Sequence, residues 1–167
     1  MKILETGRLI LREVNEDDAE FILDLVNQPS FIQYIGDRGV RTLDQARDYI
    51  ESRFSKNYRE LGFGMYAVEL AEARGPVLGI CGFVKRDELS HPDIGFAFLP
   101  QYGGRGFALE SAQAMMEHGR DKLGFSRVLA ITALDNASSA RLHGKLGFTL
   151  EREIEMGYEV LNLFCAI

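Results

Sequence analysis

Cysteine and long apolar runs are scarce in this sequence, and each shortage excludes a class of protein. The two cysteines, Cys81 and Cys165, lie in separate apolar runs with no histidine or second cysteine nearby. Such spacing fits neither a disulfide framework nor a cysteine metal site, so we predict buried thiols, a reducing compartment and no metal. No apolar run approaches the length of a membrane span, and the first residues lack the apolar segment of a signal peptide. These absences predict a cytoplasmic protein.

Positive charge is also in short supply. The chain has 19 lysine and arginine residues against 25 aspartate and glutamate residues, which gives a net charge of −6 at pH 7. A nucleic-acid partner normally requires a basic surface, so we expect none, whereas an acidic surface is compatible with a cationic acceptor such as an amine. With 167 residues, 46% of them hydrophobic, the chain is long enough for one substantial core and short for two. We therefore predict a single domain over residues 1–167.

Apolar periodicity divides the chain into an ordered series of strands and helices. It predicts strands at 8–14, 63–70, 77–84, 93–99, 126–134, 148–154 and 158–166, with a turn at 73–76. Helical spacing behind capping residues predicts helices at 15–29, which Pro29 closes, and at 42–54, 104–123 and 135–147. This order implies an α/β (α+β) fold, with a mixed central sheet and helices on both faces.

The stretch 101–108 (QYGGRGFA) lies between one of these strands and a helix. Its glycines at 103, 104 and 106 predict a sharp turn or a close approach of another molecule to the backbone. A helix that starts after such a loop presents unpaired N–H groups and the positive end of a dipole. These features together favour an anion site, with phosphate as the commonest biological occupant.

Two familiar phosphate loops do not match this stretch. A P-loop ends in Gly-Lys-Ser/Thr, but Gly106 is followed by Phe107 and Ala108. A dinucleotide-binding loop needs a third Gly or Ala where Leu109 stands. On glycine content alone, a turn without any ligand remains open as the alternative.

Three stretches of the chain together resemble a known family. Residues 101–108 (QxxGxGxA) resemble the cofactor signature of the GNAT superfamily of acetyl-CoA-dependent N-acetyltransferases, and 136–148 (NxxSxRLxxKLGF) resemble its second conserved segment. Residues 5–12 (ETxRLxLR) are similar to the branch that contains the ribosomal-protein alanine N-acetyltransferases. The stretches occur in the family's order and spacing, and the resemblance covers essentially the whole chain. It implies acetyl transfer to a primary amine, with a protein N-terminal amine as one candidate acceptor.

The resemblance also implies which residues hold acetyl-CoA, the co-substrate. In this family, the strand before the loop carries a bulge and splays from the next strand, and here the backbone of Phe98 and Leu99 would pair with the pantetheine arm. Asn136 matches a side-chain contact to the pantetheine region, although it could also cap the following helix. The backbone amides that would hold the pyrophosphate are those of Gly103, Gly104, Arg105, Gly106, Phe107 and Ala108.

For the chemistry, the resemblance points to Asp93 and His143. Asp93 falls where some members carry a catalytic Glu and would act as a base through a water molecule; a polar strand end opposite His91 is the alternative, and Glu88 and His91 are weaker candidates. A backbone N–H near the strand bulge would stabilise the oxyanion. Many members carry a Tyr acid where His143 stands, and His143 could replace it as an imidazolium, act weakly, or simply face solvent. An N-terminal amine, with a reference pKa of about 7.7–8.0, needs less help from a base than a lysine amine at about 10.4.

The acceptor leaves no signature in the sequence. Residues 31–40, 85–92 and the final hairpin would contact it. Two alternatives to a protein N-terminus stay open: a small-molecule amine as acceptor, or an acyl-CoA-binding module without turnover. The apolar run 161–167 could form the edge of a homodimer or pack in the core.

Overall fold

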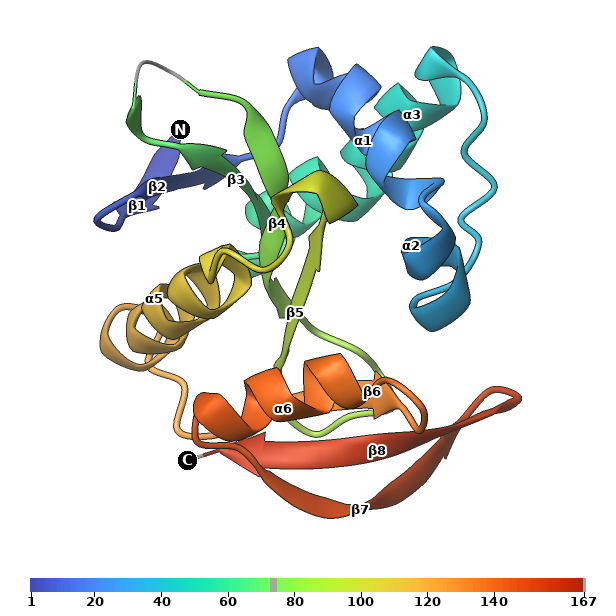
Figure 1. The fold of residues 1–167 in the computed structure, drawn as a ribbon, viewed down its shortest axis with the longest axis vertical. Helices are drawn as coiled ribbons and strands as arrows, with labels where there is room; N and C mark the ends of the chain where they lie inside the picture. The colour runs from blue at the N-terminus through green and yellow to red at the C-terminus, as the bar shows by residue number, and fades with distance from the viewer. Residues whose placement is uncertain (73–74, 167) are drawn as a thin grey trace.

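The computed structural model describes residues 1–72 and 75–166 and is built around one eight-stranded sheet (Figure 1). The strand order is β1-β2-β3-β4-β5-β6-β8-β7, and all neighbours are antiparallel except β5 and β6, which are parallel. The strands are β1 (Lys2–Glu5), β2 (Leu9–Glu13), β3 (Met65–Leu70), β4 (Val77–Val84), β5 (Asp93–Phe98), β6 (Val128–Ala133), β7 (Thr149–Met156) and β8 (Glu159–Ala166). The predicted mixed sheet is confirmed.

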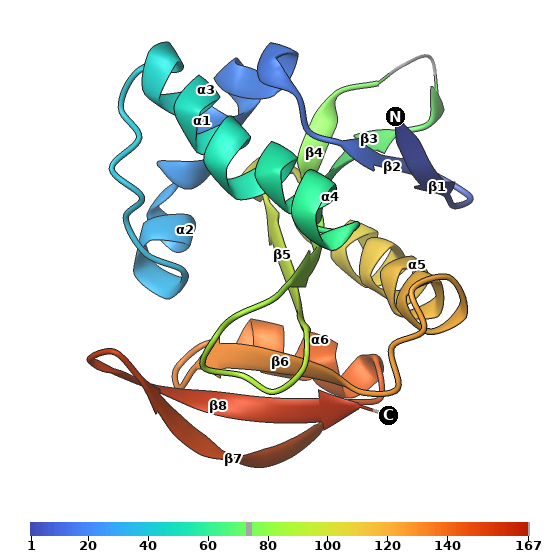
Figure 2. The ribbon, with the colours of Figure 1, turned by 180° about the vertical axis from the view of Figure 1, so that it is seen from behind.

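One face of the sheet is covered by the helices that precede β3 (Figure 2). These are α1 (Ala19–Val26), α2 (Pro29–Tyr34) and a continuous helical run formed by α3 (Leu43–Ile50), a π-helical turn (Glu51–Ser55) and α4 (Lys56–Leu61). Their buried side chains pack against Ala67, Ile80 and Leu99 of the sheet. Thr42 begins the run as predicted, because its Oγ1 accepts a hydrogen bond of 3.1 Å from the N–H of Gln45.

The opposite face carries α5 (Phe107–Asp121) and α6 (Ala137–Lys145) (Figure 1). Phe107, Ala112 and Met115 of α5 are buried against β2, β3 and β4 in the largest core cluster. The close packing of α5 on β4 requires a glycine at position 119, because a Cβ there would lie 2.7 Å from the ring of Phe83. Helices on both faces confirm the predicted layering.

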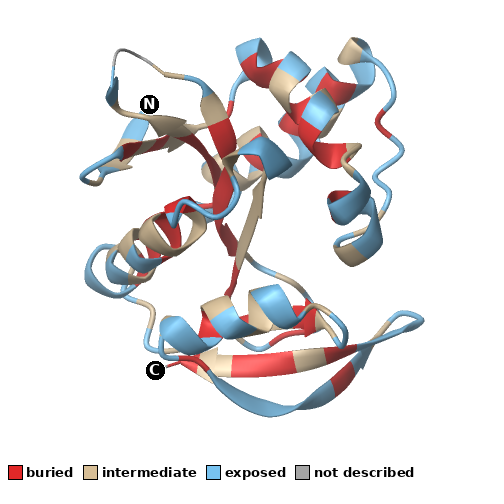
Figure 3. Cartoon of the chain, viewed as in Figure 1, coloured by how far each residue is buried: buried red, intermediate tan, exposed pale blue. Residues whose placement is uncertain are grey.

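The C-terminal strands differ from one another in their burial: β6 and most of β8 are buried or half-buried, whereas β7 is mostly exposed (Figure 3). A smaller apolar cluster of Leu89, Leu129, Ile154, Leu161 and Leu163 lies here, and the loop 85–92 supplies Leu89 to it. On β7, only Ile154 is buried, so this strand is mostly exposed. The strand β8 lies between β6 and β7, and both of its edges are already paired. Of the two alternatives left open for 161–167, the described residues therefore favour packing within the fold over the edge of a dimer.

Other local expectations also needed correction. Pro29 does not close a helix but opens α2, since its missing N–H requires no partner at the first helical position. The strand β1 was not predicted at all, and residues 73–74 of the predicted turn lie outside the described residues. Cys81 is buried, but Cys165 is only half-buried, and both are free thiols. Within 1–72 and 75–166, no helix is both long and apolar enough to cross a membrane.

Candidate functional site

The sheet opens between its two parallel strands. β5 and β6 pair only at Asp93 and Leu129, where the N–H of Leu129 donates to the carbonyl oxygen of Pro92 at 2.9 Å. Beyond this point the strands diverge, and we call the space between them the strand gap (Figure 1). A cavity of about 960 Å³ is lined by both strands, by the glycine loop and by α6. The splayed strand pair expected from the resemblance is therefore present.

The backbone of β5 offers hydrogen-bonding groups to the strand gap at alternate residues. The N–H of Leu99 donates to the carbonyl oxygen of Leu78 at 2.9 Å, so Leu99 faces β4. Because antiparallel pairing alternates, Phe98 and Phe96 direct their N–H and C=O groups away from β4 and towards the strand gap. Of the two residues predicted to pair with a ligand, Phe98 is on the open edge and Leu99 is not. Sequence reasoning missed Phe96, although its two-residue spacing from Phe98 could have indicated it.

The bulge implied by the resemblance is absent from the pairing of β4 with β5. Their register is unbroken from Val84–Asp93 to Gly79–Phe98. A glycine makes this close pairing feasible, since a Cβ on Gly79 would lie 2.4 Å from the carbonyl oxygen of Ala97. The strand gap therefore arises from the divergence of β6 rather than from an extra residue in β5.

The glycine loop leaves a run of backbone amides free. After a 3₁₀ turn (Pro100–Tyr102), Gly104 and Gly106 adopt left-handed conformations with φ of +75° and +79°, and α5 begins at Phe107. Among the described residues, the N–H groups from Gly104 to Leu109 have no hydrogen-bond partner, whereas that of Gly103 already donates to Pro100 at 3.0 Å. The free run is thus shifted by one residue from the prediction of 103–108. Free amides at a helix start are groups that can bind an anion, as the sequence suggested.

The N-terminal stretch 5–12 supports this helix start. Thr6 Oγ1 donates to Glu110 Oε2 at 2.5 Å, and Arg8 Nε donates to Glu110 Oε1 at 2.7 Å. The guanidinium of Arg8 lies 4.4 Å from the centre of the Phe107 ring. Glu110 thus ties β2 and the residues before it to the first turn of α5.

Asn136 fulfils the structural role that was considered for it. Its Oδ1 accepts a hydrogen bond of 3.2 Å from the N–H of Ser139 and so caps α6. The same residue lines the cavity. Its position therefore leaves the predicted contact to a ligand open alongside the cap.

Asp93 lies at the closed end of the strand gap. Its side chain is almost fully buried, with the residue 1% exposed, and Arg86 Nε donates to it at 3.1 Å. Burial raises the pKa of Asp93 to about 6, and the opposing effect of Arg86 is smaller. The expected neighbour His91 instead contacts Ser90, with 2.8 Å between its Nδ1 and the serine Oγ. Arg86 was missed because nothing in the loop sequence distinguishes it from Lys85.

His143 is buried, which contradicts the alternative of a solvent-facing residue. It is 2% exposed and packs against Phe96, Phe148 and Phe164, with ring centres 5.3 to 5.6 Å apart. Burial lowers the pKa of His143 to about 4, so the imidazole is neutral at pH 7. An imidazolium acid at this position is therefore not supported. Its Nδ1 and the Thr132 Oγ1 are buried without a partner among the described residues, and both side chains belong to the cavity lining.

The opposite side of the cavity is formed by the helices before β3. We call this side the helical wall. Six of its lining residues are aromatic or cationic: Phe31, Tyr34, Arg38, Tyr49, Arg53 and Phe54. Residues 31–40, which the sequence suggested as an acceptor contact, supply three of them.

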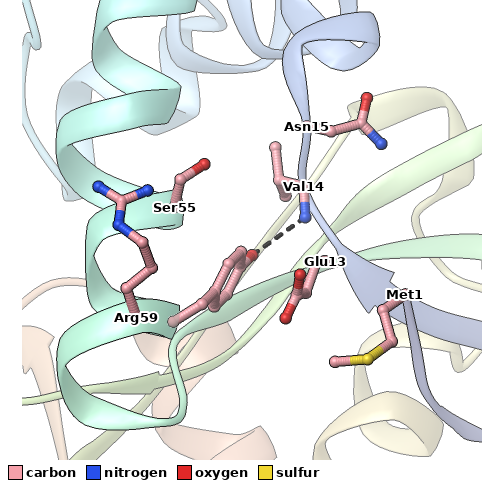
Figure 4. Close-up of a pocket in the computed structure, with 7 residues that line it drawn as sticks. Met1, Glu13, Val14, Asn15, Ser55 and Arg59 are labelled. Atoms are coloured by element: carbon pink, nitrogen blue, oxygen red, sulfur yellow. Dashed lines mark hydrogen bonds between the residues drawn. The ribbon is translucent and has the colours of Figure 1, made fainter.

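A second hollow lies elsewhere, beside the N-terminus (Figure 4). It has a volume of about 330 Å³ and is lined by Glu13, Asn15 and Arg59, among others. Tyr58 closes its floor by accepting a hydrogen bond from the N–H of Val14 at 3.0 Å and donating one to the Met65 carbonyl oxygen. These bonds connect α4 to β2 and β3, so Tyr58 has a structural role here.

Comparison with known proteins agrees with this geometry. Residues 8–149 match the model of the acetyltransferase (GNAT) domain family. This chain belongs to the GNAT acetyltransferase family. It is 31% identical over 150 residues to an uncharacterized N-acetyltransferase, YoaA of Bacillus subtilis, covering 89% of this chain and 84% of that protein. The family and the acetyltransferase class expected from the sequence are confirmed.

Solved GNAT structures share the whole fold. A GNAT-family acetyltransferase from Bordetella pertussis, described as putative, superposes with a TM-score of 0.81 at 26% identity and covers 100% of both chains. RimL, a ribosomal L7/L12 α-N-protein acetyltransferase solved with coenzyme A, gives a TM-score of 0.85 at 21% identity and covers 100% of this chain and 98% of its own. At that identity, the likeness to RimL establishes the fold alone.

Proposed function

We propose that this GNAT protein transfers an acetyl group from acetyl-CoA to a primary amine, by direct attack of the amine within a ternary complex. The observation that carries the proposal is the run of free amides at the start of α5, placed beside an open strand edge. The amides suit a pyrophosphate, and the open edge of Phe96 and Phe98 suits an extended amide-containing arm. Acetyl-CoA contains both groups.

Further groups in the cavity favour the same donor. Thr132 Oγ1 and His143 Nδ1 are buried polar atoms without partners, which a bound molecule would satisfy. Arg141 and Lys145 of α6 also line the cavity and offer positive charge to phosphates. Arg105, which is exposed on the loop, adds a further cation.

In the proposed reaction, a bond forms between the amine nitrogen and the acetyl carbon, and the bond from that carbon to sulfur breaks. Asp93 takes the proton that the nitrogen loses, directly or through water, and its pKa of about 6 leaves it ionised at neutral pH. A gap-facing N–H of β5, such as that of Phe96, would stabilise the oxyanion. Coenzyme A leaves as thiolate and takes its proton from water, because the neutral His143 has no acidic proton to give at this pH.

The acceptor would approach from the helical wall, because the donor site occupies the α5 and α6 face. A protein N-terminal amine is our first candidate, since its low pKa suits a single buried carboxylate as base. The fold likeness to RimL supports this candidate only at the level of the scaffold. A small-molecule amine and a module that binds acyl-CoA without turnover are the alternatives.

Two measurements test the proposal. Calorimetry should detect acetyl-CoA binding, and thiol release should then depend on an added amine from a panel of N-terminal peptides and small amines. Peptide-dependent release supports the first candidate, and release with small amines alone supports the second. Binding without release under any condition would indicate the non-catalytic module, and no binding would contradict the donor site itself.

A further inference from the structure

The helical wall carries positive charge that no carboxylate of the described residues neutralises. Arg38 and Arg53 line the cavity, and neither has an ion-pair or side-chain hydrogen-bond partner there. The acidic residues nearest to them in sequence are already engaged. Asp37 pairs with Arg41 at 2.6 Å, and Glu51 pairs with Arg59 at 2.6 Å. Both residues are exposed, so their guanidinium groups are free to bind an anion that enters the cavity.

The π-helical turn between α3 and α4 determines where Arg53 lies. A π turn holds one more residue than an α-helical turn, so it changes the direction of the side chains that follow. Here it buries Phe54 to 2% exposure while the adjacent Arg53 remains exposed at the cavity. The side chain of Asn57 donates to the carbonyl oxygen of Arg53 at 2.9 Å and helps to satisfy the irregular backbone. Such turns recur at functional sites, where they aim a side chain at a ligand.

The negative groups of the cavity do not offset these arginines. The carboxylates among its described lining residues are Asp93, which is paired with Arg86 at 3.1 Å, and Glu159 on the C-terminal hairpin, which forms no ion pair with Arg38 or Arg53. A polyamine acceptor would therefore meet two uncompensated cations at the helical wall, which is unfavourable. An arginine fork binds a carboxylate through two parallel hydrogen bonds, which gives both affinity and orientation.

We propose that the acceptor amine carries a carboxylate close to the nitrogen, and that Arg38 and Arg53 bind this carboxylate. This inference rests on the proposed acetyl transfer and names its acceptor class. A free amino acid and a peptide with an acidic residue next to its N-terminus present the same chemistry. The aromatic residues of the wall, Phe31, Tyr34 and Tyr49, provide apolar contacts for the rest of the acceptor.

Matched acceptor pairs test the proposal. One pair is phenylalanine and phenylalanine amide, and the other is a short peptide beginning Ala-Asp and its Ala-Asn counterpart; spermidine is the cationic probe. In at least one pair, kcat/KM from thiol release should be about tenfold or more higher for the carboxylate member, as expected for a charged hydrogen bond. The pair that shows the preference identifies the source of the carboxylate. The double variant Arg38→Gln/Arg53→Gln should abolish the preference by raising KM for that member alone.

Arg120→Gln is the matched control, because Arg120 is exposed on α5 and its ion-pair partner among the described residues is Asp121, at 3.3 Å. Equal or better turnover of the neutral members or of spermidine would overturn the carboxylate proposal while leaving acetyl transfer intact. The carboxylate proposal would also be overturned if the double variant lowered kcat/KM equally for both members of a pair. If no acceptor leads to thiol release from acetyl-CoA, the proposed transfer is wrong. Calorimetry of the same acceptor pairs with the protein–coenzyme A complex then tests the carboxylate site separately. Carboxylate-dependent binding that the double variant loses supports the site, and binding without such dependence overturns it.

Discussion

Asp93 and His143 are both buried ionisable residues, and burial shifts their pKa values in opposite directions. The carboxyl of Asp93 is raised to about 6 and the imidazole of His143 is lowered to about 4. In each case burial disfavours the charged form. Burial therefore favours the uncharged form of both side chains, but at pH 7 only His143 is uncharged, because Asp93 is ionised above its pKa of about 6. These shifts make stability depend on pH in two separable ways.

For Asp93, the folded protein holds the proton more tightly than the unfolded chain. Its contribution to stability is therefore fully present below about pH 4 and is lost as the pH rises through about 6. Replacing Asp93 with Asn should remove this loss, which amounts to at most about 3 kcal/mol. Urea unfolding at pH 5 and pH 7.5 should show that the free energy of unfolding falls less with rising pH in the variant than in the wild type. An unchanged drop would mean that Asp93 titrates normally. The variant should also lose most of its acetyl transfer at neutral pH, since Asp93 is the base in the proposed reaction.

For His143, the sign is reversed. The unfolded chain binds a proton near pH 6.5, while the folded protein resists protonation down to about 4. Stability is present above pH 6.5 and is lost as the pH falls through about 4, by up to about 3 kcal/mol. In the His143→Phe variant, the free energy of unfolding should depend less on pH between pH 7 and pH 4 than it does in the wild type. His118→Phe is a control whose pKa is also lowered by burial, but which lies on α5 away from the aromatic cluster. Because Asp93 acts in the opposite direction over the same range, the comparison is between variant and wild type: an equal pH dependence in the two would contradict the buried neutral state of His143.

At the scale of single elements, the loop before α5 can be tested with a matched pair of glycines. Gly104 and Gly124 have nearly equal φ, +75° and +72°, and neither would place a Cβ within 4 Å of another atom. An alanine at either site should therefore cost a similar free energy of unfolding, about 1 kcal/mol. Only Gly104→Ala should weaken acetyl-CoA binding, by about tenfold or more, because its Cβ narrows the anion site. Calorimetry measures the affinity of both variants for acetyl-CoA. An equal affinity in the two would mean that acetyl-CoA binds away from the glycine loop.

The same elements show what sequence can and cannot predict. The glycine loop, the strand before it, the helix after it and the cap of α6 were predictable, because each depends on local chemistry that the residue types reveal. The burial of His143 was not, because the packing of α6 against the sheet decides which side chains of this short helix are buried. The orientation of Leu99 depends on its register with β4, and the Arg86–Asp93 pair depends on how the loop 85–92 folds back. Both are tertiary facts that no single segment encodes.

At the scale of the whole molecule, the two parts of the sheet are weakly joined. β6, β8 and β7 meet the remaining strands at one residue pair, together with the shared core cluster that includes Phe148 and Phe164. We expect backbone amides of β6 and β8 to exchange hydrogen faster than those of β3 and β4, because the smaller part can separate locally. Acetyl-CoA bound in the strand gap should reduce this difference, by up to about 100-fold in protection at a concentration of 100 times Kd. Hydrogen exchange with and without acetyl-CoA measures the change. Uniform protection across the sheet without ligand would contradict the weak junction.

The outermost strand, β7, has a consequence for how the protein behaves at high concentration. Its unpaired edge is exposed and carries Glu151, Arg152, Glu153 and Glu155 almost in succession. An open strand edge can recruit the same edge of another copy and so begin an aggregate. Glu151 pairs with Arg127 at 3.1 Å, so Glu153 and Glu155 are the carboxylates of this stretch without an ion-pair partner among the described residues. Together with Arg152 they leave the edge with a net negative charge, so two such edges repel each other, which opposes aggregation. The open sheet is thereby protected on the side where no helix or strand covers its edge.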